Sequence, residues 1–378
     1  MIHTAQQSLE TCPADFLAVA CTGVRISRVK DSRFLFVPER QELFGVSPTT
    51  EQLWPLLQSG IETADFAARA AELGDDGFAV IDQLVAIGAV QYIATDEQPL
   101  DVHERVTISV GHTAIGLSFS GPIALARLRC VFRHLETPAL PDAEVVIVER
   151  EDGVGIAFSG DAPESYAWHE AGPALKLLIT ELALDAAMGM TLHLGTLQRD
   201  NEALLLVGEP GAGKSTLSVA LGSGDFELWG DDLAELRPDG RVQALPLPAT
   251  LKDGAWPMLA HLHPELEGGE AFVRPDDKTV KYLPLPPATK APVLRARCAL
   301  SLRRDDAAPP GLEPLDAKDF IAAMIAGGWS GDHRLTPDDF DGLAACADGI
   351  AFFRATYPDL PTALSLVEEA WRISGTAR

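Results

Sequence analysis

The fold of this 378-residue chain is decided by the stretch Ala203-Leu-Leu-Leu-Val207, which runs directly into Gly208-Glu-Pro-Gly-Ala-Gly-Lys-Ser-Thr216. Five consecutive apolar residues predict a strand buried on both faces, as in a largely parallel sheet. The pattern after the turn predicts a helix over residues 215–221 and a second apolar strand over residues 226–229. A strand, a glycine-rich turn and a helix in this order indicate an α/β unit.

The glycine-rich turn matches the phosphate-binding pattern G-x-x-x-x-G-K-[ST]. Its glycines allow successive backbone N–H groups to point inward at phosphate oxygens. Lys214 brings a mobile positive charge to the β- and γ-phosphates, Ser215 offers a hydroxyl to Mg²⁺, and the following helix adds a partial positive charge at its N-terminus. The predicted nucleotide-binding residues are Gly208, Gly211, Ala212, Gly213, Lys214, Ser215 and Thr216.

Two adjacent carboxylates, Asp231 and Asp232, follow the strand predicted over residues 226–229. A carboxylate at the end of a strand next to a phosphate-binding loop commonly holds Mg²⁺. Adjacent residues on an extended chain point to opposite sides, so the two carboxylates are expected to have different tasks. We therefore expect one of them to be a metal ligand and the other to be a general base.

From about residue 193 to residue 252, the chain resembles the catalytic core of HPr kinase/phosphorylase and the wider set of HPr-kinase-like proteins. The resemblance rests on Leu192-His193, on the glycine-rich loop, on the aspartate pair, and on the Pro-rich stretch before Leu251-Lys252. Residues 273–281 stand where true HPr kinase/phosphorylases carry a glycine-rich, Arg-containing signature, so reverse phosphorylase activity stays open.

This resemblance implies a set of roles for the site residues. ATP would bind the glycine-rich loop, Lys214 would act on its phosphates, and Asp231 would be the base toward a serine hydroxyl. Ser215 and Asp232 would hold Mg²⁺. His193, expected at the end of a long apolar helix over residues 173–194, would be an active-site partner of Asp231.

A basic stretch follows the aspartate pair. Residues 237–304 contain 11 Lys and Arg against 7 Asp and Glu, within a chain that has 30 basic and 55 acidic residues. If this stretch folds back over the loop, it supplies the local positive field that a polyphosphate needs. The candidates for contacting the transferred phosphate or the substrate are Lys252, Arg274, Lys278 and Lys281.

The amino-terminal part reads as two short strands over residues 24–37 and three helices that begin near Ser47, Thr63 and Gly77. This is a winged-helix-like outline. Residues 33–37, 50–54 and 81–90 make it similar to PqqD-type peptide-recognition domains, which implies that the leader of a ribosomally made precursor peptide binds as an added strand beside the third helix. The candidate peptide-recognition residues are Phe34, Leu35, Phe36, Ile81, Leu84 and Val85.

The polar, Pro-containing stretch over residues 95–100 predicts a linker. We expect a PqqD-like domain over residues 1–97 and an HPr-kinase-like domain over residues 98–378. In the second domain, residues 106–119 and 143–158 alternate like antiparallel strands, and residues 316–327, 336–348 and 361–373 read as helices. The expected fold class is α/β: a P-loop core with a mixed sheet, preceded by the small α+β domain and followed by C-terminal helices.

The composition of the chain disfavours several classes of binding partner and cellular location. The formal net charge of −25 disfavours a nucleic-acid partner, and the predicted third helix of the winged-helix-like module contains no basic residue. No long uncharged apolar stretch predicts a membrane span, and the start predicts no secretory signal. Five scattered cysteines fit reduced thiols, and we expect a cytoplasmic protein.

The sequence thus favours an ATP- and Mg²⁺-dependent kinase that phosphorylates a Ser or Thr hydroxyl of a precursor peptide recruited by its leader. Two alternatives stay open: a small-molecule kinase of the HPr-kinase-like superfamily, and a non-catalytic, nucleotide-gated peptide-binding protein. Nucleotidyl transfer also stays open, because the loop does not dictate which phosphorus is attacked. The habit of the parent family implies a possible homo-oligomer.

Overall fold

The computed structural model describes residues 16–21, 23–30, 32–94, 102–286, 291–329 and 335–375. The chain divides into two compact units, Met1–Asp101 and Val102–Arg378. The linker predicted over residues 95–100 and the start of the chain lie outside the described residues. No helix in the described ranges is long and apolar enough to cross a membrane.

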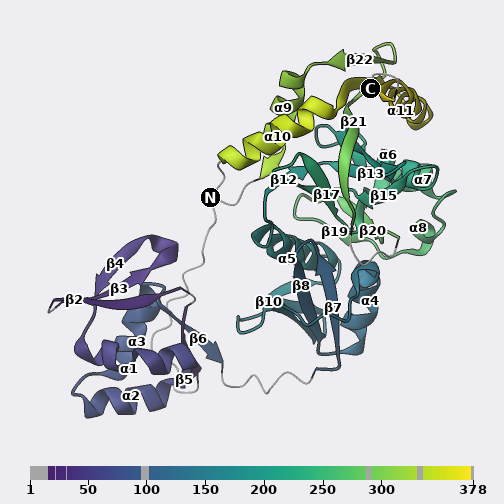
Figure 1. The fold of residues 1–378 in the computed structure, drawn as a ribbon. Coiled ribbons are helices and arrows are strands. Elements are labelled where there is room, and N and C mark those ends of the chain that lie inside the picture. Colours follow the sequence, from purple (N-terminus) through teal and green to yellow (C-terminus); the bar gives the residue numbers. More distant parts are fainter. Residues whose placement is uncertain are drawn as a thin grey trace. The chain divides into compact units, whose positions relative to one another are not determined.

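The first unit combines two small sheets, ordered β5-β1-β6 and β2-β3-β4, with three helices. Figure 1 shows the helices on one side of this unit and the β2-β3-β4 sheet on the other. The strands are β1 (Phe16–Ala20), β2 (Arg25–Val29), β3 (Ser32–Val37), β4 (Glu42–Gly45), β5 (Ile61–Glu62) and β6 (Val90–Ala94). The helices are α1 (Pro48–Ser59), α2 (Thr63–Glu72) and α3 (Gly77–Ala86), with the short 3-10 turn η1 (Pro38–Arg40) after β3.

The predicted pair of strands, β2 and β3, and the predicted starts of the three helices are confirmed. Local sequence explains where two of these helices begin. The Ser47 side chain caps α1 by accepting a hydrogen bond from the Thr50 N–H, and Asp76 caps α3 through the N–H groups of Phe78 and Ala79. Gly77 allows α3 to approach α2 closely, because a Cβ there would lie 2.4 Å from the Cα of Ala67.

The second unit opens with a five-stranded sheet of order β11-β10-β9-β8-β7. Its members are β7 (Glu104–Val110), β8 (Thr113–Phe119), β9 (Ala143–Arg150), β10 (Gly153–Phe158) and β11 (Glu164–Ala167). The predicted β7–β8 and β9–β10 antiparallel pairs are confirmed, while β8 and β9 pair in parallel. Helices α4 (Pro122–Phe132) and α5 (Ala171–Asp185) pack on this sheet, with η2 (Arg133–Leu135) after α4.

A mixed sheet of ten described strands forms the centre of the second unit. Its path runs β15-β13-β14-β21-β17-β16-β12-β23, and β24 joins β21 and β22 beside that path. The members are β12 (Met190–His193), β13 (Gly195–Arg199), β14 (Glu202–Val207), β15 (Glu227–Gly230), β16 (Leu233–Leu236), β17 (Arg241–Leu245), β21 (Val293–Arg304), β22 (Gly311–Leu315), β23 (Gly328–Trp329) and β24 (Ala351–Tyr357). β14 runs parallel to β21 and antiparallel to β13. The apolar run predicted a largely parallel sheet, whereas only one of the two neighbours of β14 is parallel to it.

The remaining elements surround this sheet. A three-stranded sheet contains β18 (Ala249–Lys252), β19 (Phe272–Val273) and β20 (Thr279–Leu283). The helices are α6 (Lys214–Gly222), α7 (Trp256–Leu259), α8 (Glu265–Gly268), α9 (Ala317–Ala326), α10 (Pro337–Gly349) and α11 (Leu360–Ser374), with η3 (Asp253–Ala255) before α7. The three predicted C-terminal helices are therefore confirmed.

Two element predictions are wrong. The helix expected over residues 173–194 ends at Asp185, and Met190–His193 is a strand paired with β16. A short apolar run does not distinguish helix from buried strand, and Gly189 permits the close approach to β16, since a Cβ there would lie 2.5 Å from the Leu236 carbonyl oxygen. The C-terminal tail is also not purely helical, because β24 lies between α10 and α11 and pairs in parallel with β21.

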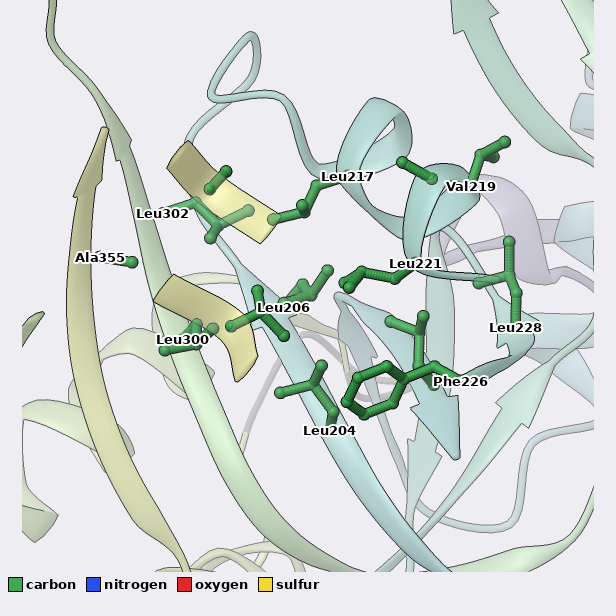
Figure 2. Close-up of a cluster of buried hydrophobic side chains, with 14 of the residues drawn as sticks. Leu204, Leu206, Leu217, Val219, Leu221, Phe226, Leu228, Leu300, Leu302 and Ala355 are labelled. Atoms are coloured by element: carbon green, nitrogen blue, oxygen red, sulfur yellow. The ribbon is translucent and has the colours of Figure 1, made fainter. Parts of the chain in front are cut away.

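One apolar cluster fixes the position of the glycine-rich loop. Figure 2 shows Leu204 and Leu206 of β14 near Leu217 and Leu221 of α6, with Leu300 of β21 beyond them. These five side chains are at most 4% exposed. Deleting a fully buried leucine side chain costs about 2–5 kcal/mol. The loop between β14 and α6 is therefore held at both ends by well-packed elements.

Candidate functional site

The glycine-rich loop connects β14 to α6, as predicted. Gly211 and Gly213 have φ angles of 94° and 96°, which side-chain-bearing residues rarely adopt. Gly208 has a different requirement: a Cβ there would lie 3.1 Å from the Leu302 carbonyl oxygen. The Tyr357 hydroxyl donates a 2.5 Å hydrogen bond to the Ala212 carbonyl, which ties the loop to the end of β24.

Lys214, the first residue of α6, lies over this loop. Its Nζ donates a 2.6 Å hydrogen bond to the Gly208 carbonyl, and the residue is 8% exposed. Burial lowers the pKa of Lys214, Asp232 and Asp231 act in the opposite direction, and Lys252 lowers it further. The loop lysine is thus within electrostatic reach of both carboxylates.

Asp231 lies in the turn between β15 and β16 and is 2% exposed. Its Oδ2 accepts a 3.2 Å hydrogen bond from the Thr250 N–H, while its Oδ1 is buried without a hydrogen-bond partner in the described part of the chain. Burial, followed by the neighbouring charge of Asp232, raises the pKa of Asp231 to about 6; Lys176, the Ser215 hydroxyl and the Thr250 N–H partly offset this rise.

Asp232 is more accessible, with a side chain 35% exposed. Its Oδ2 lies 3.4 Å from the Lys176 Nζ, and its Oδ1 lies 3.3 Å from the His193 Nδ1. Burial acts to raise the pKa of Asp232, but Lys176, His193 and Lys214 together hold it below its ordinary value. Asp232 is therefore ionised at neutral pH.

His193 ends β12, next to Asp232. Burial lowers the pKa of this imidazole, Asp232 raises it, and Lys214 and Lys176 lower it again. The resemblance implied that His193 is an active-site partner of Asp231, whereas the carboxylate that His193 contacts in the structure is that of Asp232. Leu194, which follows His193, donates its N–H to the Asp232 carbonyl, so the backbone itself brings these two residues together.

Lys176 is the site residue that the sequence did not reveal. It comes from α5 and is 8% exposed. Its Nζ donates a 2.6 Å hydrogen bond to the Thr250 Oγ1 and lies 5.6 Å from the centroid of the Tyr282 ring. In the sequence, Lys176 is one of three charged residues, with Glu181 and Asp185, in a largely apolar helix, and such charged residues are usually exposed.

The other predicted cations lie in different surroundings. Lys252, at the end of β18, is close enough to affect Lys214. Arg274 and Lys278 both pair with Asp276, at 3.3 and 2.8 Å. Lys281 is buried, donates a 2.5 Å hydrogen bond to the Leu266 carbonyl, and lies 4.5 Å from the centroid of the Trp256 ring. Among the described contacts, only Lys252 of these four is linked to the loop.

The carboxylates and the loop fit a Mg²⁺ ion. Mg²⁺ in kinases is usually held by one or two carboxylates together with substrate phosphates and water. Asp231 supplies a buried oxygen without a hydrogen-bond partner and a raised pKa, both of which a cation would relieve. The Ser215 hydroxyl is close to the same carboxylate. The described residues contain no cluster of three or more His, Cys, Asp or Glu side chains that would hold a metal without a nucleotide.

The first unit contains a groove of its own, between β4 and α3. It has a volume of about 580 Å³ and is lined by apolar and polar residues of both elements, together with Asp75 and Asp76. Within the described strands, β4 pairs with β3 on one side and with no strand on the other. An unpaired strand edge beside a helix is a common site for adding a peptide strand.

Of the six residues predicted to recognise a peptide, only Leu84 lines this groove. Leu35 and Ile81 are fully buried in the core of the unit, and Val85 packs against that core. Phe34 and Phe36 belong to β3, the central strand of its sheet. The apolar pattern identified the buried faces, whereas the groove uses residues next to them, including Phe44, Val46, Ala79, Val80, Gln83 and Ile87.

Comparisons with known proteins add little. No family model matches the chain, and no curated protein matches it. Among solved structures, the chain is similar to the Hpr(Ser) kinase/phosphatase from Coxiella burnetii, with 15% sequence identity and a TM-score of 0.23. The match covers 47% of this chain and 94% of that chain. At this TM-score the likeness carries no argument, so the function has to be inferred from the residues of the site.

Proposed function

We propose that this protein is an ATP- and Mg²⁺-dependent kinase that phosphorylates a Ser or Thr hydroxyl of a peptide bound by its amino-terminal unit. The observation that carries the proposal is the convergence of Lys214, Asp231, Asp232, Lys176 and His193 beside one glycine-rich loop. These residues come from α5, β12, α6 and the turn after β15. Phosphoryl transfer depends mainly on positioning and charge stabilisation, and such a cluster provides both.

The two carboxylates divide the work in the opposite sense to the one that the resemblance implied. Asp231 is nearly inaccessible and lies beside Ser215, which suits a metal ligand. Asp232 is accessible, ionised, and contacted by Lys176 and His193, which suits the group that accepts the hydroxyl proton. When bound, Mg²⁺ neutralises charge on the β- and γ-phosphates.

In the proposed reaction, the acceptor hydroxyl oxygen forms a bond to the γ-phosphorus, and the bond from that phosphorus to the β,γ-bridging oxygen breaks. The hydroxyl proton goes to Asp232, and ADP leaves with the electron pair of the broken bond. Lys214 stabilises the negative charge on the phosphates, while Lys176 and His193 hold the Asp232 carboxylate in place.

The groove beside β4 supports a peptide as the substrate. An extended segment added to the β4 edge would form backbone hydrogen bonds there and place alternate side chains against α3. Asp75 and Asp76, which line the groove, would favour basic residues in the segment. A kinase for a small molecule would not need this groove.

The test uses a synthetic copy of a short precursor peptide encoded beside the gene, incubated with the whole protein and MgATP. We expect its mass to rise by about 80 Da, the mass of one phosphoryl group, and the gain to disappear when the acceptor Ser or Thr is replaced by Ala. The Lys214→Met and Asp232→Asn variants should form the product at least about 10²-fold more slowly than the wild-type protein. Full turnover in either variant would contradict the assignment.

The groove is tested with a matched pair of variants. Ala79→Trp fills the groove from α3, whereas Ala68→Trp adds the same side chain to an exposed position of α2 outside it. Ala79→Trp should raise the KM for the peptide at least about tenfold and leave the KM for ATP unchanged, whereas Ala68→Trp should change neither. Turnover of a small hydroxyl compound, with peptides untouched, would favour a small-molecule kinase. ATP binding without any transfer would favour a nucleotide-gated binding protein.

A further inference from the structure

A second cavity adjoins the glycine-rich loop, and the proposed chemistry does not use it. It has a volume of about 420 Å³ and is bounded by α6, by α7 and the turn after it, by the ends of β21 and β24, and by the start of α11. Gly213 and Thr216 of the loop line it directly. All of these elements belong to the second unit.

The lining is predominantly apolar. Met258, Leu262, Leu360 and Leu364 face the cavity together with Tyr357. Met258 and Leu262, which both line the cavity, are 36% and 38% exposed. Tyr357 is 4% exposed, and its hydroxyl is held by the Ala212 carbonyl, so this wall of the cavity is rigidly attached to the loop.

Two neighbouring residues at the start of α6, Ser215 and Thr216, lie on different sides of the loop. The Ser215 hydroxyl lies close to Asp231, on the side of the charged cluster. Thr216 lines the apolar cavity. Arg304, at the end of β21, and Asp359, just before α11, also line the cavity, so it carries one charge of each sign.

A nucleoside triphosphate needs both a charged site for its phosphates and an apolar site for its base. Its phosphates are satisfied by backbone N–H groups, lysine and metal, whereas its base is a flat aromatic ring that gains from apolar contact. We propose that this cavity is the nucleobase subsite of the proposed nucleotide site, with the base against Tyr357, Leu360 and Leu364. A cavity of about 300–1,000 Å³ is usual for ligands of this size.

This inference rests on the proposed function, because it assumes that the loop binds nucleotide phosphates. Two probes separate the claims: MgATP carries phosphates and a base, whereas magnesium tripolyphosphate carries phosphates alone. Binding of both to the wild-type protein is measured by titration calorimetry. We expect ATP to bind at least about tenfold more tightly than tripolyphosphate.

Two variants alter the cavity from different walls. Leu364→Trp fills it from α11, and Met258→Asp places a carboxylate at an exposed position of α7. Each should reduce ATP affinity to about that of tripolyphosphate, a loss of at least about tenfold, with tripolyphosphate affinity unchanged. Ile325→Asp, at an exposed position of α9 outside the cavity, is the matched control and should keep the wild-type ratio.

The outcomes are distinguishable. If the wild-type protein binds neither probe, the proposed function fails. If it binds both equally, or if both cavity variants keep the wild-type ratio, the loop still binds phosphates but the nucleobase subsite is refuted. If both cavity variants lose the binding of ATP and of tripolyphosphate alike, this also counts against the subsite. The substitutions would then have disturbed the phosphate-binding loop as a whole and not the contacts of the base.

Discussion

The two sides of the glycine-rich loop differ sharply in chemistry. On one side, Asp231, Asp232, Lys176 and His193 form a charged cluster around Lys214. On the other, an apolar cavity begins at Gly213 and Thr216 and contains Arg304 at the end of β21. Both sides depend on the same nine-residue helix, α6, and on the strands next to it.

If the proposed function holds, this difference separates reaction from recognition across the loop. Substitutions on the charged side should then lower kcat, because the proposal assigns these groups to the transferred phosphoryl group. Substitutions on the apolar side should raise the KM for ATP and leave kcat at saturating ATP unchanged. The charged side can be tested residue by residue, from the largest expected effect to the smallest.

The largest effect is expected for Lys214→Met. This variant removes the positive charge that lies over the loop, and we expect single-turnover phosphoryl transfer to fall roughly 10³-fold, with peptide affinity unchanged. Lys278→Met is a matched control, because Lys278 is exposed and pairs with Asp276. A rate within a few-fold of wild type for Lys214→Met would show that the loop lysine is not part of the reaction.

Asp232→Asn and Asp231→Asn should separate the two carboxylates. Asp232→Asn should lower kcat about 10²-fold while Mg²⁺ affinity is retained, since it removes the proton acceptor. Asp231→Asn should instead weaken Mg²⁺ binding, so that high Mg²⁺ restores part of the rate. Rates measured over a Mg²⁺ titration would distinguish them. The reverse pattern would support the roles that the family resemblance implied.

Lys176→Met should lower kcat about tenfold by leaving Asp232 without its cationic neighbour. The pKa of Asp232 should then rise, and the acidic limb of the kcat profile should move to higher pH. Lys281→Met is the matched control, because Lys281 is also buried and contacts an aromatic ring. That variant should lose stability without a change in the pH profile. An unshifted profile in Lys176→Met would remove Lys176 from the site.

The smallest expected effect is on the pH dependence of the increase in Tm that Mg²⁺ causes. Because the pKa of Asp231 is raised to about 6, the folded protein without metal holds this proton more tightly than the unfolded chain does. The stability from this group is therefore present at low pH and is lost as pH rises toward 6. Mg²⁺ requires the ionised form, so the Tm increase that it causes should grow between about pH 5 and about pH 7.

Asp231→Asn should abolish this growth, whereas Asp239→Asn should retain it. Asp239 is a suitable control because it is an exposed aspartate that pairs with Arg241, remote from the loop in sequence and in contacts. A Mg²⁺-induced Tm increase that is constant across this pH range would contradict a metal site at Asp231. Differential scanning fluorimetry is sufficient for the measurement.

The loop and the aspartate pair could be located from the sequence because their chemistry is local. The strand, the three glycines and Lys214 lie within a dozen positions, and the backbone angles of Gly211 and Gly213 match that expectation. Lys176 could not be found in this way, because its partner Thr250 is 74 positions away. Only the fold brings α5 and β18 together.

His193 and the peptide groove show two other limits. The partner of His193 depends on whether residues 190–193 form a helix or a strand, and these four residues, Met-Thr-Leu-His, are too few to show a periodicity that decides this. In the first unit, the same apolar pattern predicted α3 correctly but marked its buried face, and Ile81, which it offers as a recognition residue, belongs to the core.

The parallel pairing of β14 with β21 has a consequence for how the protein is made. Residues 208–292, which include the loop and the aspartate pair, lie in sequence between these two adjacent strands. During synthesis, β14 therefore leaves the ribosome well before the strand that covers its other edge. Such non-local parallel pairing is slow to form and exposes apolar edges while it is incomplete. Nascent chains that end before residue 293 would display an unprotected Leu204–Leu206 edge, a natural target for chaperones, and the proposed nucleotide binding would be among the last properties acquired on refolding.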